Sequence, residues 1–579
     1  MNSPSRAFLR FPLAVLAVCV ISLAAAAQST NRQIGTQFEV TADPVVPRPH
    51  QKPCVVPLFT GYQFALFSET TQTFSFTPPS KCSGPWAKVV FEADFSENAG
   101  VQFDRTASMY LGNTNIYFGT TPEPLQNATN TWHVERDVTD YSALLASPQA
   151  GTMVLQNCTT DCPPPYNTLL NGVFTVNADL EFYPAQGHGQ NQQGQGQQAQ
   201  DQPDGRNAPD MVLPMVQTTS GGINLPAYLL SNGSQFTTTF TLPTNIERAY
   251  LDVIAQSQQV DEQWYACFPN DLNSINEVYG CGNTDFREVE VTIDGQPAGI
   301  SPVSAWVFTG FLPDQWVPMP GAQTLEFVPY RVNLTPFAGM LNDGNPHTIS
   351  LSVFNENYYF TSTASLLLFL DHGSTQVTGA VTKNTFTAPS PVVSENLQGT
   401  TTVTGTIGVT SNRQFTIEGY VNTSHGKVTT SVSEHQNFSS TQTIDFDTVN
   451  FTVLDQNTSV HNSVSATTKT WSKDGLLFTE DNFSFPITVD VVIPVSSATF
   501  GLTVATTQNY QTSKQVWFDG FPLYFNWLSN SVKGSDVSPA ASSQHYTYFD
   551  SQGTFYDCKI ASQNNTLTAV SRSCTLGKN

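Results

Sequence analysis

The feature that most limits the fold of this chain is its series of short, strand-like runs, which turn residues interrupt before any helical periodicity develops. β-Branched and aromatic residues gather in such runs at 72–76, 87–91, 173–182, 248–255 and 347–354. Runs of this kind, bounded by Gly, Pro, Asn and Asp, are typical of strands in antiparallel sheets. The sequence therefore predicts an all-β protein built from sandwiches.

Composition divides the predicted fold into segments. Within residues 28–185, an extended, Pro-containing entry segment (28–53) is followed by strand-like runs. Such runs also fill 211–377, whereas residues 186–210 are rich in Gln and Gly and too polar to join a core. From about residue 378 the composition shifts to Thr, Ser, Val and Asn. We expect two sandwich domains, a flexible linker between them, and a third, β-rich region over 378–579. The linker is the obvious place for proteolytic cleavage, after which the protein would persist as two associated chains.

The first 27 residues have the pattern of a secretory signal peptide. Two arginines, Arg6 and Arg10, precede the apolar run 11–23, and four alanines follow it at 24–27. The run is too short to span a bilayer, and no later run is long and apolar enough. We expect residues 1–27 to be removed and the mature protein to be secreted, with no membrane partner.

The cysteines agree with an oxidising compartment. Of the nine, Cys19 lies in the signal peptide, which leaves an even set of eight. We expect pairing between neighbours along the chain, although sequence alone does not fix connectivity: Cys54 with Cys82, Cys158 with Cys162, Cys267 with Cys281, and Cys558 with Cys574. There is no CxxC pair and the histidines lack metal-ligand spacing, so we expect neither a metal site nor any other cofactor.

Charge is sparse and acidic. Only 12% of residues are charged, the net charge is −23 and the isoelectric point is about 4.6. This balance disfavours nucleic acids and anionic membranes as partners. Sequons for N-glycosylation are spread along the chain and suit a glycosylated extracellular protein: Asn127, Asn157, Asn232, Asn333, Asn422, Asn437, Asn450, Asn457, Asn482 and Asn564.

Two parts of the chain follow the same plan. The segment 103–113 has Phe-Asp-Arg, a strand and a Gly-Asn turn, and it resembles 286–295, which has Phe-Arg-Glu, a strand and an Asp-Gly turn. Residues 137–141 likewise resemble 333–337. Two copies of one β-plan imply two adjacent sandwiches with a shared face, where ligand sites are common.

The central candidate for chemistry is Asp104, in the motif Phe103-Asp104-Arg105. An Asp-Arg pair at the mouth of a strand, before a hairpin turn, can place a carboxylate at a sheet edge next to a guanidinium. On the pair alone, a structural surface ion pair is the more frequent outcome.

Other acidic residues lie beside aromatic, Pro or Arg neighbours. A carboxylate beside Trp and Tyr can act as a general acid or base in a sugar-binding cleft, whereas the alternative is a strand-edge acid beside a packed ring. For Glu262 the two readings are about even. No GxSxG elbow supports a serine nucleophile. The remaining candidates are Glu123 in Thr-Pro-Glu-Pro, Glu262 before Trp264 and Tyr265, and Asp285, Arg287 and Glu288 in Asp-Phe-Arg-Glu.

Several motifs lie in order along the chain: QFDR (102–105) with its strand and LGN turn, TPEP, Trp132 with DVTDYSALL, DEQWY, FREVEVTIDG, GFLPDQW (310–316) and NLTPF. Through them the chain resembles, over roughly residues 50–375, the acidic peptide:N-glycanases, the peptide-N4-(N-acetyl-β-glucosaminyl)asparagine amidase A type of plants and fungi. Through the aromatic-Asp-Arg motif, the DVTD segment and LPTNIERAYL (242–251), the bacterial F-type peptide:N-glycanase looks like a distant relative.

The resemblance implies two adjacent jelly rolls and hydrolysis of the amide bond between an Asn side chain and the first N-acetylglucosamine of an N-glycan. It makes Asp104 the primary catalytic carboxylate, with Arg105 or Arg287 orienting it or stabilising developing charge. Glu262 or Asp285 would assist the leaving nitrogen. Further substrate contacts are expected from Trp132, Trp264, Tyr265, Glu123, Arg287 and Glu288.

The chain departs from the F-type pattern at the second and third acids. Before Phe286 it reads Cys-Gly-Asn-Thr-Asp without the expected Glu, and at the third position it has Gln156-Asn157-Cys158. Two other classes therefore stay open. A secreted β-sandwich lectin or wall protein would bind glycans and release nothing, and a carboxylate glycoside hydrolase would cut a sugar–sugar bond.

Overall fold

The structure is a computed structural model in which strands dominate and, among the residues described below, each helical element is a single turn. The all-β prediction is confirmed. The helical turns are η1 (Thr139–Tyr141), α1 (Ser142–Leu145), η2 (Gln259–Asp261), η3 (Trp264–Ala266), η4 (Thr335–Phe337) and α4 (Ala338–Leu341). The described residues are 35–36, 43–65, 70–122, 127–155, 170–185, 208–231, 233–272, 281–306, 321–449, 452–492, 503–535, 538–551, 553–564, 566–571 and 574. Within these ranges, no helix has the length and apolar composition needed to cross a bilayer.

The first sandwich pairs a sheet of strand order β1-β7-β4-β9-β2 with a sheet of order β3-β8-β5-β6. Apolar side chains of both sheets meet in one core, with Phe91 and Phe182 from the first and Met109 and Met153 from the second. The strands are β1 (Gly35–Thr36), β2 (Cys54–Phe64), β3 (Thr71–Phe76), β4 (Trp86–Glu97), β5 (Thr106–Leu111), β6 (Thr114–Thr120), β7 (Asn130–Asp137), β8 (Gln149–Leu155) and β9 (Phe174–Pro184).

The second sandwich has the sheets β10-β20-β15-β18, with β13 also paired to β20, and β14-β19-β16-β17. A separate hairpin joins β11 to β12. The strands are β10 (Met211–Pro214), β11 (Gln217–Thr219), β12 (Gly222–Asn224), β13 (Ala227–Leu230), β14 (Phe236–Phe240), β15 (Ile246–Gln258), β16 (Glu288–Ile293), β17 (Gln296–Pro302), β18 (Tyr330–Asn333), β19 (His347–Phe354) and β20 (Tyr359–Leu370).

The two sandwiches repeat one topology, in agreement with the echo in the sequence. The orders β7-β4-β9-β2 and β3-β8-β5-β6 correspond strand for strand to β18-β15-β20-β10 and β14-β19-β16-β17. Hydrogen bonds repeat as well: Thr139 Oγ1 accepts from Val89 N at 2.9 Å, and Thr335 Oγ1 accepts from Ala249 N at 3.2 Å.

Strand register corrects the alignment of the two copies by one residue. Both hairpins carry an irregularity at the same place, between Met109 and Tyr110 and between Val291 and Thr292, one residue before the strand ends. Counting back from these ends, Arg105 corresponds to Arg287. Asp104 therefore corresponds to the phenylalanine that precedes Arg287, and the second copy has no equivalent carboxylate.

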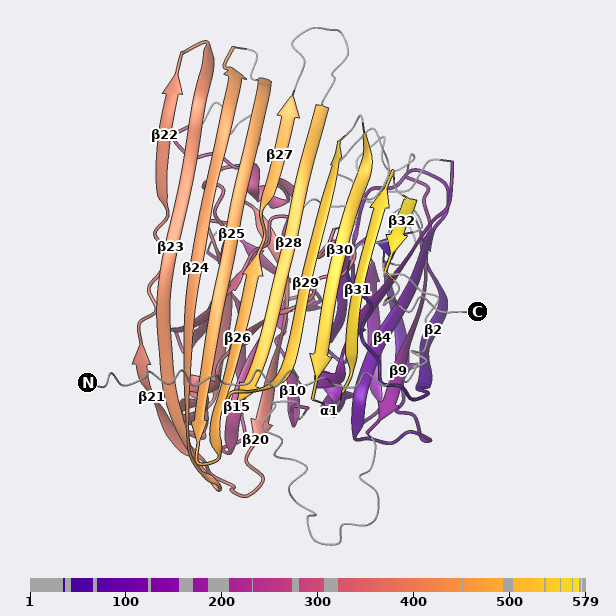
Figure 1. Ribbon diagram of the computed structural model, residues 1–579, viewed down its shortest axis with the longest axis vertical. Helices are drawn as coiled ribbons and strands as arrows, with labels where there is room; N and C mark the ends of the chain where they lie inside the picture. Colours follow the sequence, from indigo (N-terminus) through magenta and orange to yellow (C-terminus); the bar gives the residue numbers. More distant parts are fainter. Residues whose placement is uncertain are drawn as a thin grey trace, which may run out of the picture.

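A twelve-stranded sheet, here called the long sheet, covers both sandwiches on one side (Figure 1). Its order is β21-β23-β24-β25-β26-β28-β29-β30-β31-β32, with β22 on β23 and β27 on β25 and β28. In β23 and β24 buried and solvent-facing residues alternate, as in a sheet with one packed face. The strands are β21 (Thr378–Asn384), β22 (Val392–Gln398), β23 (Thr402–Thr423), β24 (Gly426–Asp447), β25 (Thr452–Ser472), β26 (Gly475–Ser484), β27 (Ile487–Val492), β28 (Thr503–Phe518), β29 (Phe521–Ser535), β30 (Ser538–Asp550), β31 (Phe555–Gln563) and β32 (Thr566–Val570).

Polar side chains anchor the long sheet to the second sandwich. Arg413 of β23 forms a buried ion pair with Glu288 of β16. Gln323, which precedes β18, donates to the hydroxyl of Tyr510 at 3.0 Å. Apolar residues of both layers also share one core cluster, so the C-terminal region completes the core of the second sandwich.

Three of the four predicted disulfides are present: Cys54–Cys82, Cys267–Cys281 and Cys558–Cys574. The remaining pair, Cys158 and Cys162, lies outside the described residues, as do the signal peptide, most of the 186–210 linker and the motif at 310–316. The proposed domain boundaries themselves stay predictions.

Candidate functional site

The loop that carries Asp104 leads directly into β5 and is held at both ends of the Asp-Arg motif. Arg105 N donates to Thr121 Oγ1 and Thr121 N donates to Arg105 O, each at 2.8 Å. The Arg105 guanidinium donates to Oε1 of the buried Gln102 at 2.7 Å. Burial raises the pKa of Asp104 to about 6, and the positive charge of Arg105 opposes this rise. The loop thus presents a half-buried carboxylate beside a fixed cation.

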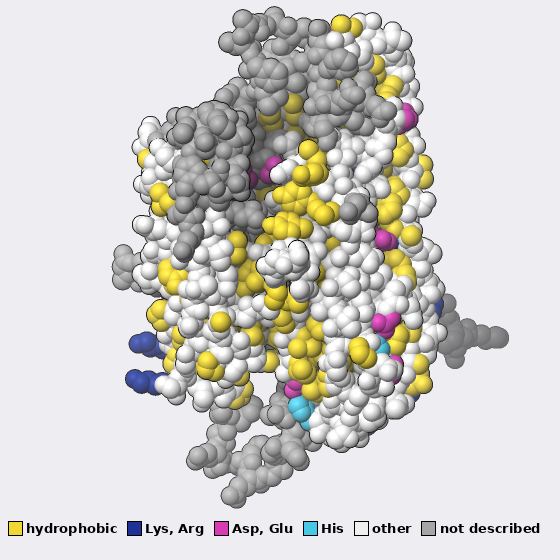
Figure 2. All heavy atoms as spheres, turned by 180° about the vertical axis from the view of Figure 1, so that it is seen from behind, with side chains coloured by type: hydrophobic (Ala, Val, Ile, Leu, Met, Phe, Trp, Pro, Cys, Tyr) yellow, Lys and Arg dark blue, Asp and Glu magenta, His cyan; other side chains and the backbone are white. Residues whose placement is uncertain are grey.

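The same loop lies where the two sandwiches meet. Thr106, two residues after Asp104, donates its hydroxyl to Gln256 Oε1 at 3.1 Å and accepts from Gln258 Nε2 at 3.3 Å. Both glutamines belong to β15 of the second sandwich. Seen from the side opposite the long sheet, the molecule shows acidic side chains in its upper half (Figure 2). Asp104 therefore occupies the junction that the repeated plan predicts for a ligand site.

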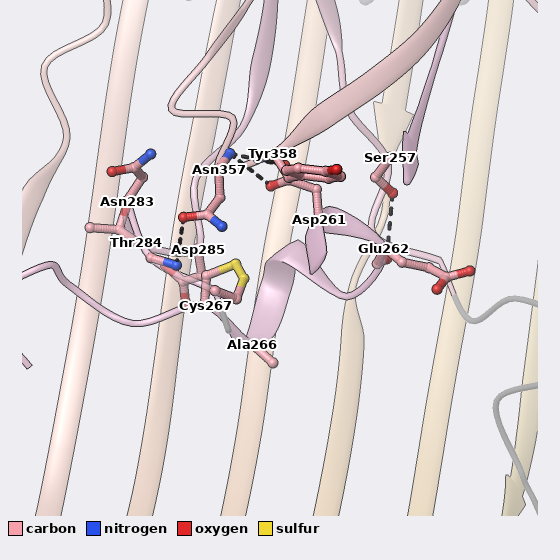
Figure 3. Close-up of a disulfide and its surroundings, with 12 residues drawn as sticks. Ser257, Asp261, Glu262, Ala266, Cys267, Asn283, Thr284, Asp285, Asn357 and Tyr358 are labelled. Atoms are coloured by element: carbon pink, nitrogen blue, oxygen red, sulfur yellow. Dashed lines mark hydrogen bonds between the residues drawn. A yellow bond between two sulfur atoms is a disulfide. The ribbon is translucent and has the colours of Figure 1, made fainter. Parts of the chain in front are cut away.

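Glu262 is brought toward this junction because it follows β15 and η2. It is half-buried, and its backbone carbonyl accepts from Ser257 Oγ at 3.4 Å. Its side chain points away from the Cys267–Cys281 disulfide and from Asp285 (Figure 3). The pKa of Tyr359 is raised to about 12, mainly by burial, and nearby Glu262 contributes to the rise. Of the two candidates for the second acid, Glu262 is the one that reaches solvent.

Asp285 is fully enclosed beneath the long sheet. Its Oδ2 accepts from Gln442 Nε2 of β24 at 2.9 Å, and burial raises its pKa to about 6. A group that assists a leaving nitrogen must reach the substrate, whereas the polar partners of Asp285 come from the long sheet. The structure therefore does not support a catalytic role for Asp285 and gives it an interface role.

Arg287 and Glu288 are also enclosed, which corrects their assignment to substrate binding. Arg287 donates to Asp261 at 3.0 Å and to the carbonyl of Thr284 at 2.7 Å. Asp261 in turn accepts from the backbone N of Tyr358 at 2.6 Å. Burial lowers the pKa of Arg287 against the opposing effect of Asp261. Arg287 thus fixes the loops around the disulfide, while Glu288 is committed to the ion pair with the long sheet.

The three aromatic residues expected to face sugars are core residues instead. Trp132 is 3% exposed and stacks on Phe95 in the first sandwich, with ring centroids 5.0 Å apart. Trp264 and Tyr265 are fully buried in the core that the second sandwich shares with the long sheet. A ring that stacks on a pyranose must present one face to solvent, and in this structure none of the three rings does. Glu123 lies outside the described residues.

The described residues contain one group that has the spacing of a cation site, Glu92, His133 and Glu135, whose candidate ligand atoms lie within 4.8 Å of one another. Arg48 already occupies it: its guanidinium bonds Glu92, and it donates to Glu135 at 2.7 Å. Burial would lower the pKa of His133, but Asp94 and Glu135 outweigh it and raise the pKa to about 9. The cluster is therefore an ion-pair network that joins Arg48 of the entry segment to the first sandwich.

Comparison with known proteins shows which family model and which relative the sequence matches. Residues 44–386 match the family model described as peptide N-acetyl-beta-D-glucosaminyl asparaginase amidase A. The chain is 30% identical over 402 residues to peptide-N4-(N-acetyl-beta-glucosaminyl)asparagine amidase A of Prunus dulcis, and the match covers 68% of this chain and 66% of that protein, just under two thirds of its length.

Solved structures are similar at a lower level. Peptide:N-glycanase F of Flavobacterium meningosepticum gives a TM-score of 0.35 at 13% identity, over 55% of this chain and 96% of that one. PNGF-II gives a TM-score of 0.37 at 14% identity, over 55% of this chain and 66% of that one.

Proposed function

The chain belongs to the peptide N-acetyl-beta-D-glucosaminyl asparaginase amidase A family, and we propose that it is an amidase acting on N-glycosylated peptides and proteins. In this reaction water adds to the side-chain amide carbon of the glycosylated Asn, and the bond from that carbon to nitrogen breaks. The peptide keeps an Asp, and the sugar leaves as a glycosylamine, which later loses ammonia to water.

The observation that carries the proposal is the half-buried Asp104 at the junction of the two sandwiches. Its ionised carboxylate would accept a proton from the attacking water while the oxygen approaches the amide carbon. Arg105, held by Gln102 at 2.7 Å, would keep the carboxylate oriented and stabilise charge on the amide oxygen. Because burial raises the pKa of Asp104 to about 6, it can exchange protons in a mildly acidic medium.

Glu262 is our candidate for the acid that assists the leaving nitrogen. It reaches solvent, and it follows β15, the strand whose Gln258 bonds the Asp104 side of the junction at 3.3 Å. A protonated Glu262 would give its proton to the nitrogen as the bond to carbon breaks, so that a neutral amine departs. Asp104 would release to solvent the proton that it took from water, and Glu262 would regain a proton from solvent.

The test is to incubate the protein with a short N-glycopeptide at pH 5 to 7 and to identify both products by mass spectrometry. We expect a peptide with Asp in place of the glycosylated Asn, together with the whole glycan. Asp104→Asn should reduce the rate by a factor of at least about 10³. Asp474→Asn, an exposed Asp on the long sheet, is the matched control and should retain wild-type activity.

Two other products would point to the rival classes. A peptide that keeps one N-acetylglucosamine on Asn would indicate a glycoside hydrolase. Glycan binding without any cleavage would indicate a lectin, and Asp104 would then be a structural ion pair.

We further propose that the protein is secreted after removal of residues 1–27 and is N-glycosylated. The three disulfides support an oxidising compartment. Cleavage within 186–210 would leave two chains that stay associated, because Tyr117 OH donates to Leu325 O at 2.8 Å and Arg331 pairs with Asp140 at 2.5 Å across the cut. N-terminal sequencing of protein from the culture medium tests secretion, removal of residues 1–27 and cleavage within 186–210, and the intact mass of the chains tests N-glycosylation.

A further inference from the structure

Five uncharged side chains form an exposed surface on the second sandwich, here called the tyrosine platform. They are Tyr228 and Leu230 of β13, Val260 of η2, Tyr358, and Tyr359 of β20. Tyr358 is 49% exposed, Leu230 44% and Val260 37%. The ring of Tyr359 lies 5.2 Å from that of Tyr358 and 5.9 Å from that of Tyr228, centroid to centroid. Exposed apolar surface of this kind marks interaction sites in soluble proteins.

Strand register places the platform next to the Asp104 loop. Gln258 pairs with Tyr359, and Tyr359 pairs with Leu230, so the three side chains form one row on the same face of the sheet. At one end of this row Gln258 donates to Thr106, two residues after Asp104, at 3.3 Å. Leu230, at the other end, is two strand spacings from Gln258, or about 10 Å. Seen from the side opposite the long sheet, hydrophobic side chains form a band down the molecule (Figure 2).

The platform is held rigidly by the buried ion pair behind it. Asp261 accepts from the backbone N of Tyr358 at 2.6 Å and from that of Asn357 at 2.9 Å (Figure 3). Arg287 donates to the same carboxylate at 3.0 Å. Gln259, which precedes Val260, has a φ of 51°, an unusual backbone conformation for a non-glycine residue. A loop whose backbone is held in this way loses little conformational entropy when a ligand covers it.

We propose that the tyrosine platform binds the polypeptide part of the substrate, through apolar side chains near the glycosylated asparagine. This inference rests on the proposed amidase function. Leu230 and Val260 offer no hydrogen bonds to sugar hydroxyls, whereas they match aliphatic or aromatic side chains of a peptide. An extended peptide advances about 3.3 to 3.6 Å per residue, so the row of about 10 Å from Gln258 to Leu230 has the length of about three residues of bound peptide.

The test compares two glycopeptides that carry the same glycan and differ only within three residues of the asparagine, with Leu and Phe in one and Ser in the other. We expect the wild type to prefer the apolar peptide by about tenfold in kcat/KM, the effect of partly burying one aliphatic side chain. In Leu230→Ser and Tyr358→Ser this ratio should fall toward one. Leu230→Lys should instead favour a glycopeptide with Glu at these positions.

Phe521→Ser is the matched control, since Phe521 is 73% exposed on the long sheet, and it should keep the wild-type ratio. Equal kcat/KM for both peptides in the wild type would overturn the platform proposal while leaving the amidase intact. A loss of inhibition by free oligosaccharide in the platform variants, with the peptide preference unchanged, would overturn it in favour of a sugar site. Absence of any Asn-to-Asp conversion would refute the amidase function itself.

Discussion

Glu434 and Glu288 share one arginine, Arg413, in the buried interface between the long sheet and the second sandwich. Glu434 is 5% exposed and Glu288 is fully buried. Burial is the main cause that raises the pKa of Glu434, and the neighbouring Glu288 adds to it, so that the pKa reaches about 8. One arginine cannot neutralise two carboxylates, and Glu434 is therefore protonated in the folded protein at neutral pH.

The raised pKa of Glu434 makes the free energy of unfolding depend on pH. In the unfolded chain Glu434 ionises near its ordinary pKa of 4.5, whereas in the folded protein it does so near 8. The contribution of Glu434 to the free energy of unfolding is therefore complete below pH 4.5, and it is lost as the pH rises toward 8. Between pH 4.5 and pH 7 the loss amounts to about 3 kcal/mol, at about 1.36 kcal/mol for each pH unit.

Glu434→Gln removes this dependence because the amide has nearly the shape of the protonated carboxyl and does not ionise. Relative to the wild type, the variant should gain about 3 kcal/mol in free energy of unfolding between pH 4.5 and pH 7. Urea unfolding followed by tryptophan fluorescence at several pH values measures this difference. Glu418→Gln, a half-buried carboxyl on β23, is the control. A stability difference between variant and wild type that does not change with pH would refute the reasoning.

Three further outcomes are expected. If Asp104 must be ionised to act as base, kcat/KM should fall tenfold per pH unit below its pKa of about 6, and a pH–rate profile without that limb would contradict the role. Arg287→Met leaves the carboxylate of its ion pair buried and alone, and should lower the free energy of unfolding by about 3 to 5 kcal/mol in denaturant titrations. Gly119→Ala would place a Cβ 2.0 Å from the carbonyl oxygen of Leu325 and should destabilise the contact between the sandwiches by about 1 to 3 kcal/mol. Gly221→Ala, where the new Cβ meets no close atom, should leave the stability unchanged, and thermal unfolding compares the two variants.

The fold class, the repeated plan and the family could be predicted from the sequence, and so could three disulfide pairs between neighbouring cysteines. These features depend on short-range patterns. Residue types and turn residues predict strands, neighbouring cysteines predict disulfides, and a contiguous motif identifies the Asp104 loop. Each pattern can be recognised without the tertiary structure, because it involves residues close together in the chain.

Which aromatic and charged side chains reach solvent is a property of the tertiary structure alone. The sequence predicts that Trp264 and Tyr265 face a sugar, yet they are buried, while Tyr358, more than 90 residues farther along, is 49% exposed beside the same loop. Asp285 and Glu262 likewise look equivalent in sequence, but the long sheet covers the first and leaves the second accessible. Burial depends on which layer packs against a strand, and here that layer is a sheet formed more than 100 residues away in the chain.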